Sequence, residues 1–443
     1  MKAKKLLACV MAMTMAASMA ACGSGNEGDK GGKSTSETKE TASSAASTSK
    51  SGEAEKVQLT VWGPQEDQAP LEGYDEGILK AMCDTFAEEH PEWDITFEYG
   101  VCSEGDAKDV VTKDVDAAAD VFMYANDQIP VLAKAGAISK LGGTTADAVT
   151  KANPESMVAS VTYEDGLYGV PFTSNTWFMY YDKSMYTEDE VKSLDAMMAK
   201  DLGADVKNFG FALTNSWYIE AFYFGAGCQL FGDGTDASAG CDFDSEAGIE
   251  ATKYLVELSQ SSKFLNEQDG SSIAAMADGK LGAYCSGSWD AAAIKEALGD
   301  NFAATKIPSV TINGTEGQMR SFSGSKAIGV NPKCENPEVA VALALYLGSE
   351  ECQTIRYTTR GIIPTLTALE SNADVAADPV ALAQMAEISE AAYLQPVLDE
   401  MASYWTPAET MGKEIVQGDV TIDNAADKTQ TMVEGILSSG LSE

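Results

Sequence analysis

Histidine and positive charge are both scarce in this chain. One histidine, His90, and 30 lysines and arginines stand against 68 acidic residues, so the 443-residue chain has a net charge of −38. Phosphate backbones would repel such a chain, and nucleic acid is therefore a poor partner. A single histidine excludes an H-E-x-x-H zinc site, and any Ser-His-Asp triad would have to use His90. Because His90 precedes Pro91 at a predicted helix end, we expect it only to terminate that helix.

Other catalytic and metal-binding motifs are also missing. The sequence has no C-x-x-C, no G-x-S-x-G and no P-loop, which argues against zinc, thioredoxin-like, hydrolase and nucleotide sites. We expect no cofactor, no metal and no enzyme activity. A glycosidase needs only two carboxylates, however, so 68 acidic residues leave a surface glycan-active enzyme open, and a surface adhesin is a third alternative.

Long apolar runs are absent except near the N-terminus. Three lysines (Lys2, Lys4 and Lys5) precede an apolar stretch, 6–20, that is too short to span a bilayer stably, which predicts a signal peptide over 1–21. The stretch ends in Met-Ala-Ala-Cys22, which resembles the lipobox of bacterial lipoproteins, where the cysteine carries the lipid; a secretory signal cut elsewhere is the alternative. Residues 22–56 are almost without apolar side chains and predict a lipidated Cys22 followed by a flexible tether.

The cysteines leave the disulfide state open. Without Cys9 in the signal and Cys22, seven of the nine remain, an odd number that leaves at least one thiol unpaired. One interpretation is that disulfide bridges join Cys83 to Cys102 and Cys228 to Cys241. The alternative is that these cysteines are buried free thiols.

The folded part begins with alternating strands and helices. Strands are predicted at 57–62, 93–99 and 120–124, with helices at 77–90, from 100 to about 118, and at 127–135. This βαβαβ order predicts a parallel sheet with ligand-binding groups at the carboxyl ends of its strands. The second half predicts strands at 209–213 and 283–289, helices at 217–224 and 250–259, and a turn-rich hairpin at 232–240.

The stretch 167–183 predicts a crossing between two lobes. Pro171 cannot donate to a strand ladder, polar residues follow at 173–176, and an apolar strand comes next. The stretches 321–330 and 361–364 predict a second and a third crossing. The expected fold class is α/β with an N-terminal lobe (57–171 plus 326–363) and a C-terminal lobe (176–321 plus 367–443).

Six short motifs follow the lipobox and the tether along the chain: Leu59–Trp62, Asp120–Asp127, Tyr163–Pro171, Tyr180–Lys183, Gly279–Trp289 and Ser403–Trp405. In this order and spacing the chain resembles the extracellular solute-binding proteins of ATP-driven (ABC) sugar importers, and most closely the members that bind maltose and maltodextrin. The resemblance implies a two-lobed periplasmic-binding-protein-like fold with three hinge crossings. It also implies a monomer that captures maltose or maltodextrin, an α-1,4-glucan, at the extracellular face of the bacterial cytoplasmic membrane and delivers it to permease subunits. Another oligosaccharide is the alternative.

The resemblance also implies which residues bind the sugar. One face of a glucose ring is a patch of C–H groups that pairs with an aromatic ring, while the hydroxyls at its rim need hydrogen-bond partners, and we expect rings from both lobes. Asp127 matches a carboxylate of the family; Asn175 and Asn215 stand where the family has glutamates, and Glu409 stands near its arginine. We expect Trp177 to be core. The candidate ligand-binding residues are Trp62, Glu66, Asp67, Tyr124, Asp127, Asn175, Asn215, Trp217, Trp289, Tyr404, Trp405 and Glu409.

Overall fold

The computed structural model describes residues 54–438, which lie within one compact unit. The predicted signal peptide, the lipidation site Cys22 and all but the last three residues of the predicted tether lie outside the described residues. Within 54–438, none of the helices is both long and apolar enough to cross a bilayer.

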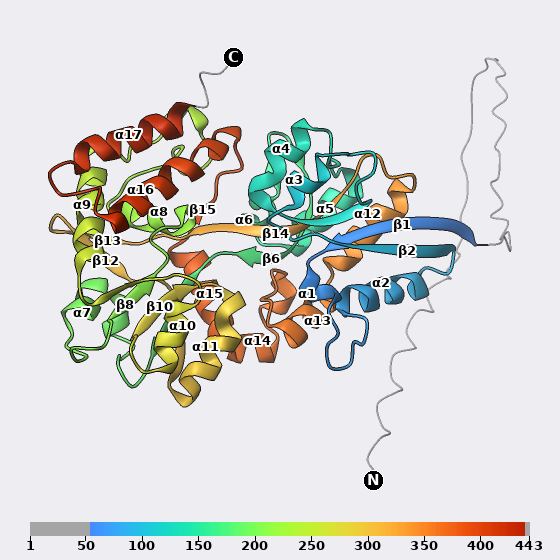
Figure 1. Ribbon diagram of the computed structural model, residues 1–443. Helices are drawn as coiled ribbons and strands as arrows, with labels where there is room; N and C mark the ends of the chain where they lie inside the picture. Colours follow the sequence, from blue (N-terminus) through green and yellow to red (C-terminus); the bar gives the residue numbers. More distant parts are fainter. Residues whose placement is uncertain (1–53, 439–443) are drawn as a thin grey trace, which may run out of the picture. The chain divides into compact units, whose positions relative to one another are not determined.

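A six-stranded sheet forms the first layer of the fold (Figure 1). Strand β1 (Glu55–Gly63) lies parallel to β2 (Trp93–Val101) on one side and to β3 (Val121–Ala125) on the other. Strand β14 (Phe322–Val330) runs antiparallel to β3 and to β6 (Val170–Asn175), and its first residues pair with β15 (Tyr393–Leu394). The predicted parallel strands are confirmed.

Alternating apolar residues attach the helices to this sheet. Val57, Leu59 and Val61 of β1 are buried, and so is the apolar side of α2 (Ile78–Glu89), which falls within the predicted helix at 77–90. Helix α12 (Pro337–Leu347) packs on β14 and α2, and α13 (Glu350–Arg360) follows it. Helix α2 ends just before His90, as expected. The predicted helix from 100 to 118 is wrong in extent, because only α3 (Ala107–Val111) forms there.

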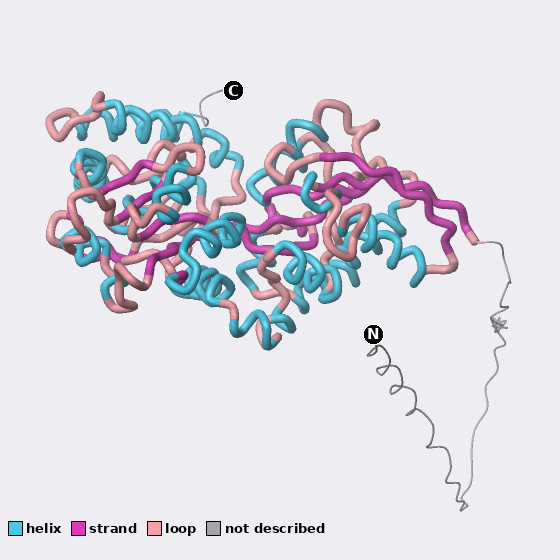
Figure 2. The backbone as a smooth tube through the Cα atoms, turned by 60° about the horizontal axis from the view of Figure 1, so that its bottom comes forward, coloured by secondary structure: helices cyan, strands magenta, loops and turns pink. Residues whose placement is uncertain are grey.

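A second, five-stranded sheet has the order β11-β7-β10-β8-β9. Its strands are β7 (Phe178–Asp182), β8 (Phe209–Phe211), β9 (Phe264–Asn266), β10 (Ala283–Ser286) and β11 (Phe302–Thr305). Figure 2 shows the two groups of strands with helices around each. The helices that pack with the second sheet or on one another beside it are α8 (Ser216–Gly225), α9 (Glu246–Gln260), α10 (Ser271–Ala277), α11 (Ala291–Leu298), α15 (Pro379–Glu390), α16 (Trp405–Gln417) and α17 (Ala425–Leu437).

The remaining elements are short. They are α1 (Gln65–Gln68), α4 (Ile129–Lys134), α5 (Gly143–Ala152), α6 (Glu155–Ser160), β4 (Thr162–Tyr163), β5 (Gly166–Leu167), α7 (Leu194–Ala199), β12 (Ser309–Ile312), β13 (Thr315–Gln318), α14 (Ala373–Ala377) and the 3₁₀ turns η1 (Asn126–Gln128), η2 (Glu190–Lys192), η3 (Ala237–Ala239), η4 (Ser288–Asp290), η5 (Gly299–Asn301), η6 (Thr367–Leu369) and η7 (Asp399–Ser403).

The three connections between the two sheets are bonded to one another. Thr176, between β6 and β7, donates from Oγ1 to the Phe322 carbonyl at 2.8 Å, and the same oxygen lies 2.9 Å from Ser321 Oγ. Thr173 of β6 donates to the Ile363 carbonyl at 2.8 Å. The polar residues predicted at the first crossing thus tie it to the second and the third. The exact lobe boundaries stay a prediction.

The structure corrects the predicted hairpin and the proposed disulfide bridges. The hairpin at 232–240 is wrong: the stretch is a turn containing η3, capped by the Asp236 side chain, and the flanking residues Leu230 and Cys241 form only an isolated bridge. All seven cysteines of the described part are buried free thiols, which corrects both proposed bridges and favours the thiol alternative.

Candidate functional site

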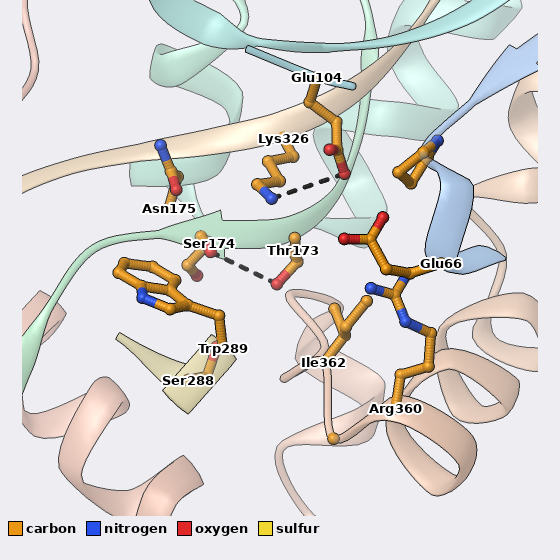
Figure 3. A pocket seen from close by; sticks show the side chains of 12 residues that line it. Glu66, Glu104, Thr173, Ser174, Asn175, Ser288, Trp289, Lys326, Arg360 and Ile362 are labelled. Carbon is orange, nitrogen blue, oxygen red and sulfur yellow. Dashed lines mark hydrogen bonds and ion pairs between the residues drawn. The ribbon is translucent and has the colours of Figure 1, made fainter. Parts of the chain in front are cut away.

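Two adjoining cavities lie where the sheets meet, and Asn175 at the end of β6 lines both. Their volumes are about 280 and 320 Å³, so together they fall within the roughly 300–1,000 Å³ typical of small-molecule sites. We call the two together the groove. The first cavity (Figure 3) is lined by Pro64, Glu66, Glu104, Thr173, Ser174, Asn175, Ser288, Trp289, Lys326, Arg360, Gly361 and Ile362. The second is lined by Lys108, Asp127, Asn175, Asn215, Ser216, Trp217, Gln395 and Trp405.

Three tryptophans form the aromatic side of the groove: Trp217, Trp289 and Trp405. The rings of Trp217 and Trp289 have centroids 5.8 Å apart and an interplanar angle of 33°. Trp289 is 50% exposed, so its faces are available to a ligand. All three come from η4 or from helices α8 and α16, which pack with the second sheet or its core. The expectation of rings from both lobes is therefore wrong.

Local contacts hold two of these indoles, Trp217 and Trp289, in position. Trp217 Nε1 donates to Gln395 Oε1 at 2.9 Å, and its backbone N–H is capped by Asn215 Oδ1 at 2.9 Å. Trp289 folds back over Gly287, where a Cβ atom would lie only 2.0 Å from the indole ring. Glycine at 287 is thus required for this ring position, and the groove is pre-organised on its aromatic side.

Charged side chains form the opposite side. Glu104 is buried, and its carboxylate lies 3.5 Å from Lys326 Nζ of β14. Arg360, at the end of α13, pairs with the buried Asp67, whose neighbour Glu66 is exposed at the cavity wall. These groups can accept and donate hydrogen bonds to hydroxyls.

Asp127 lines the second cavity directly after β3. Its position at the carboxyl end of a parallel strand is the one that the sequence predicts. Desolvation raises the pKa of the Asp127 carboxyl to about 6, although the positive charge of Lys108 acts in the opposite direction. The carboxyl therefore changes charge in a mildly acidic range.

Seven of the predicted ligand-binding residues meet in the groove: Glu66, Asp127, Asn175, Asn215, Trp217, Trp289 and Trp405. Trp62 and Glu409 do not line it. Trp62 is half-buried over Gly100, where a Cβ atom would lie 2.4 Å from its ring, and Glu409 pairs with Lys413 on its own helix. Trp177 is core as expected, at 1% exposure.

Three predicted contacts are corrected because their side chains are fully buried. Tyr124 has no exposed surface, and its hydroxyl donates to the Tyr168 carbonyl at 3.1 Å. Tyr404 is equally buried and donates to the Ser216 carbonyl at 2.9 Å. Asp67 is 1% exposed and serves as an internal ion-pair partner. Each polar atom has a protein partner, so these residues support the groove and do not line it.

Sequence reasoning missed part of the lining. Glu104 follows β2 closely, so the strand-end rule applied to Asp127 would also have found it. Pro64 follows β1 directly and Ser288 follows β10 by two residues, so the same rule would have found them too. The others come from strands, helices and loops without this signal; they are Lys108, Thr173, Ser174, Ser216, Lys326, Arg360, Gly361, Ile362 and Gln395.

The family model of the bacterial extracellular solute-binding proteins matches residues 81–383. The chain belongs to this family. A solved structure described as a complex with acarbose is 46% identical, with a TM-score of 0.80 and coverage of 86% of this solute-binding protein and 99% of that chain. The maltodextrin-binding protein MalE1 from L. casei BL23, without ligand, is 27% identical, with a TM-score of 0.77 and coverage of 86% and 98%.

Sequence relatives agree with this assignment. The galactooligosaccharide-binding protein of Bacillus subtilis (strain 168) is 26% identical over 332 residues, which cover 72% of this chain and 77% of the relative. The resemblance that the sequence predicted is confirmed, and so is the two-lobed α/β fold class.

Proposed function

We propose that this solute-binding protein captures maltodextrin-type α-1,4-glucan oligosaccharides in the groove. The observation that carries the proposal is the pair of adjacent indoles, Trp217 and Trp289, with Trp405 lining the same groove opposite carboxylates, amides and cations. Indole faces pair with the C–H faces of glucose units and exclude water. The polar side supplies the partners that the hydroxyls lose on leaving water.

The names of similar proteins support an oligosaccharide ligand. One similar structure is a complex with acarbose and another is a maltodextrin-binding protein, whereas a sequence relative is named for galactooligosaccharides. The glucan is the first choice because several rings along a groove suit a chain of stacked glucose units. Galactooligosaccharide, for which that one relative is named, is the alternative.

The proposal extends to delivery. Sugar that contacts both sides stabilises the closed form of the two lobes, and the closed protein hands its ligand to the permease subunits of an ABC importer. Lipid attached at Cys22 would hold the protein, as a monomer, at the extracellular face of the cytoplasmic membrane. Two experiments test the anchor. We expect globomycin, an inhibitor of the lipoprotein signal peptidase, to block processing, and we expect a Cys22→Ser variant to lose its membrane association.

Calorimetric titration with maltose to maltoheptaose, galactooligosaccharides, isomaltose and xylotriose tests the ligand class. We expect saturable one-to-one binding with the highest affinity among the α-1,4-glucans. Tighter binding of galactooligosaccharides would replace the glucan by the alternative, and no binding of any sugar would contradict the proposal.

The carboxylates in the groove make an enzyme test worthwhile. Glu66, Glu104 and Asp127 all line it, and glycoside hydrolysis needs two carboxyl groups flanking the bond. We expect maltoheptaose to remain intact after prolonged incubation with excess protein, because binding is the proposed task. Shortened products, lost in a Glu104→Gln variant, would show a glycan-active enzyme instead.

A further inference from the structure

A buried ion network lies behind the first cavity. The Asp67 carboxylate, in α1, pairs with Arg356 at 3.5 Å and with Arg360, both on α13. Asp67 and Arg356 have side chains only 1% and 0% exposed, whereas Arg360 is 21% exposed and reaches the cavity. The network thus joins the protein interior to the groove.

Arg356 is the fixed end of this network. Its Nη1 donates to the Leu347 carbonyl at 2.6 Å, and its guanidinium lies 4.6 Å from the ring centroid of Phe172. A buried carboxylate that is separated from its cations is strongly destabilised. Asp67 is therefore held in place, and it holds Arg360 in turn.

The same anchor places a carboxylate beside the guanidinium. Glu66 is the chain neighbour of Asp67 in the short helix α1 and lines the same cavity as Arg360 (Figure 3). Within the described residues Glu66 has no ion-pair partner, and the hydrogen bond of Arg360 to Asp67 uses Nη1. A guanidinium carries five N–H donors, so donors remain for a ligand next to a carboxylate that accepts.

These two residues lie at one end of the groove. Glu66 and Arg360 line only the first cavity; Trp217 and Trp405 line only the second, and Asn175 lines both. Trp289, which lies against Trp217, belongs to the first cavity and therefore bridges the junction. A disaccharide stacked on Trp217 and Trp405 lies in the second cavity, whereas a longer chain extends past Asn175 into the first cavity, which Arg360 lines.

We infer that Arg360 and Glu66 form an end subsite that hydrogen-bonds the terminal sugar unit of longer oligosaccharides, and that Asp67 positions Arg360. This inference rests on the proposed function. It makes chain-length preference a property of the charged end, separate from the stacking surface that gives basal affinity. Lys326, in the same cavity, is already matched by Glu104, so the subsite suits a neutral sugar with hydroxyl groups and not a free anion.

The test is the length dependence of binding in three variants, measured by calorimetry with maltose, maltotriose, maltotetraose and maltoheptaose. For Arg360→Gln we expect about 10-fold weaker binding of maltotetraose and longer chains and less than about 2-fold for maltose, as for loss of one charge-assisted hydrogen bond. Arg360→Lys should recover part of the loss, because it keeps the charge without the planar fork. Lys253→Gln, which breaks an ion pair on α9 away from the groove, is the control and should change nothing.

Two further variants separate recognition from folding. Glu66→Ala removes an exposed side chain outside the buried network, so it should fold normally and show the same length-dependent loss. Asp67→Asn should lower the melting temperature and also reproduce the length-dependent loss, with no added loss when combined with Arg360→Gln. A merely structural Asp67 would change stability without changing the ratio of maltotetraose to maltose affinity.

The outcomes are distinct. Equal losses at every chain length, or no loss in both Arg360→Gln and Glu66→Ala, would overturn the end subsite while leaving the proposed function intact. Failure of the unaltered protein to bind any glucan would contradict the proposed function itself.

Discussion

The two sides of the groove are built from different residues and attached to different sheets. The indoles come from elements that pack with the second sheet or its core, whereas the carboxylates Glu66, Glu104 and Asp127 follow strands of the first. An aromatic surface contributes apolar contact area with no directional preference. Charged groups form directional hydrogen bonds, but they lose their hydration when the ligand binds. The difference teaches that affinity and selectivity can be separated in this protein: stacking on one side, hydroxyl recognition on the other.

The largest effect should come from the aromatic side. Trp289→Ala should weaken maltotetraose binding by about 2 kcal/mol, roughly 30-fold, because a central stacking surface is lost. Its melting temperature should change little, since the side chain is 50% exposed. Calorimetry and thermal unfolding measure the two quantities.

A matched tryptophan outside the groove sharpens that result. Trp62→Ala should lower stability, because the ring packs over Gly100, but should leave affinity within about 3-fold, since Trp62 lines neither cavity. Equal affinity losses in the two variants would contradict the assignment of stacking to the three groove indoles.

The crossings belong to neither side, so a change there should alter stability more than sugar preference. Buried Glu387 accepts from the Ile307 N–H at 2.8 Å and from Ser321 Oγ at 2.7 Å. Glu387→Gln replaces one of the two accepting oxygens by an NH2 group that faces a protein donor, and should destabilise folding by about 1.5 kcal/mol, measured by urea unfolding. If Glu387→Gln left the stability unchanged but altered the order of glucan affinities, the separate assignment of stability to the crossings and of sugar preference to the groove would be contradicted.

The charged side should show a pH dependence that the aromatic side lacks. Because burial raises the pKa of Asp127 to about 6, its carboxylate becomes protonated, and a poorer acceptor for sugar hydroxyls, as the pH falls below that value. Glucan affinity should fall by roughly 3- to 10-fold between pH 7 and 5. Titrations across this range check it.

The same raised pKa acts on folding with the opposite sign. A carboxyl whose pKa is higher in the folded state contributes most to stability below its unfolded pKa, and that contribution is lost as the pH rises through about 6. Asp127→Asn should remove both dependences. A binding profile as steep in Asp127→Asn as in the unaltered protein would assign the titration to another group.

The smallest effect is expected at Glu409. This residue pairs with Lys413 along α16 and lines neither cavity, so Glu409→Gln should change affinity less than 2-fold, in keeping with an exposed ion pair. A loss of glucan affinity above about 10-fold would show that the ligand-binding groove extends past Trp405.

The sequence predicted the architecture and most of the aromatic side. The period-2 and helical patterns identified β1, β2, β3 and α2, and the strand-end rule located Asp127. Burial was harder to foresee. Tyr124 lies one residue inside the end of β3 and is sealed by β14 and Tyr168, contacts that no local pattern reveals.

Arg360, at the charged end of the groove, was missed for the same reason. Arg360 reaches the groove only because α13 ends beside α1, some 290 residues away in the chain, where Asp67 pairs with it. Asp67 was predicted as a ligand contact, but its role depends on that long-range pairing. Residues brought together by tertiary packing, and not by a strand end or a turn, were beyond sequence reasoning.

A crystal structure of the protein with maltotetraose tests the central claim most directly. We predict glucose rings stacked on Trp217, Trp289 and Trp405, with hydroxyls bonded to Asp127 on one part of the chain and to Glu66 or Arg360 at its far end. Sugar bound elsewhere, or bound in the groove with the three indole faces free, would contradict it.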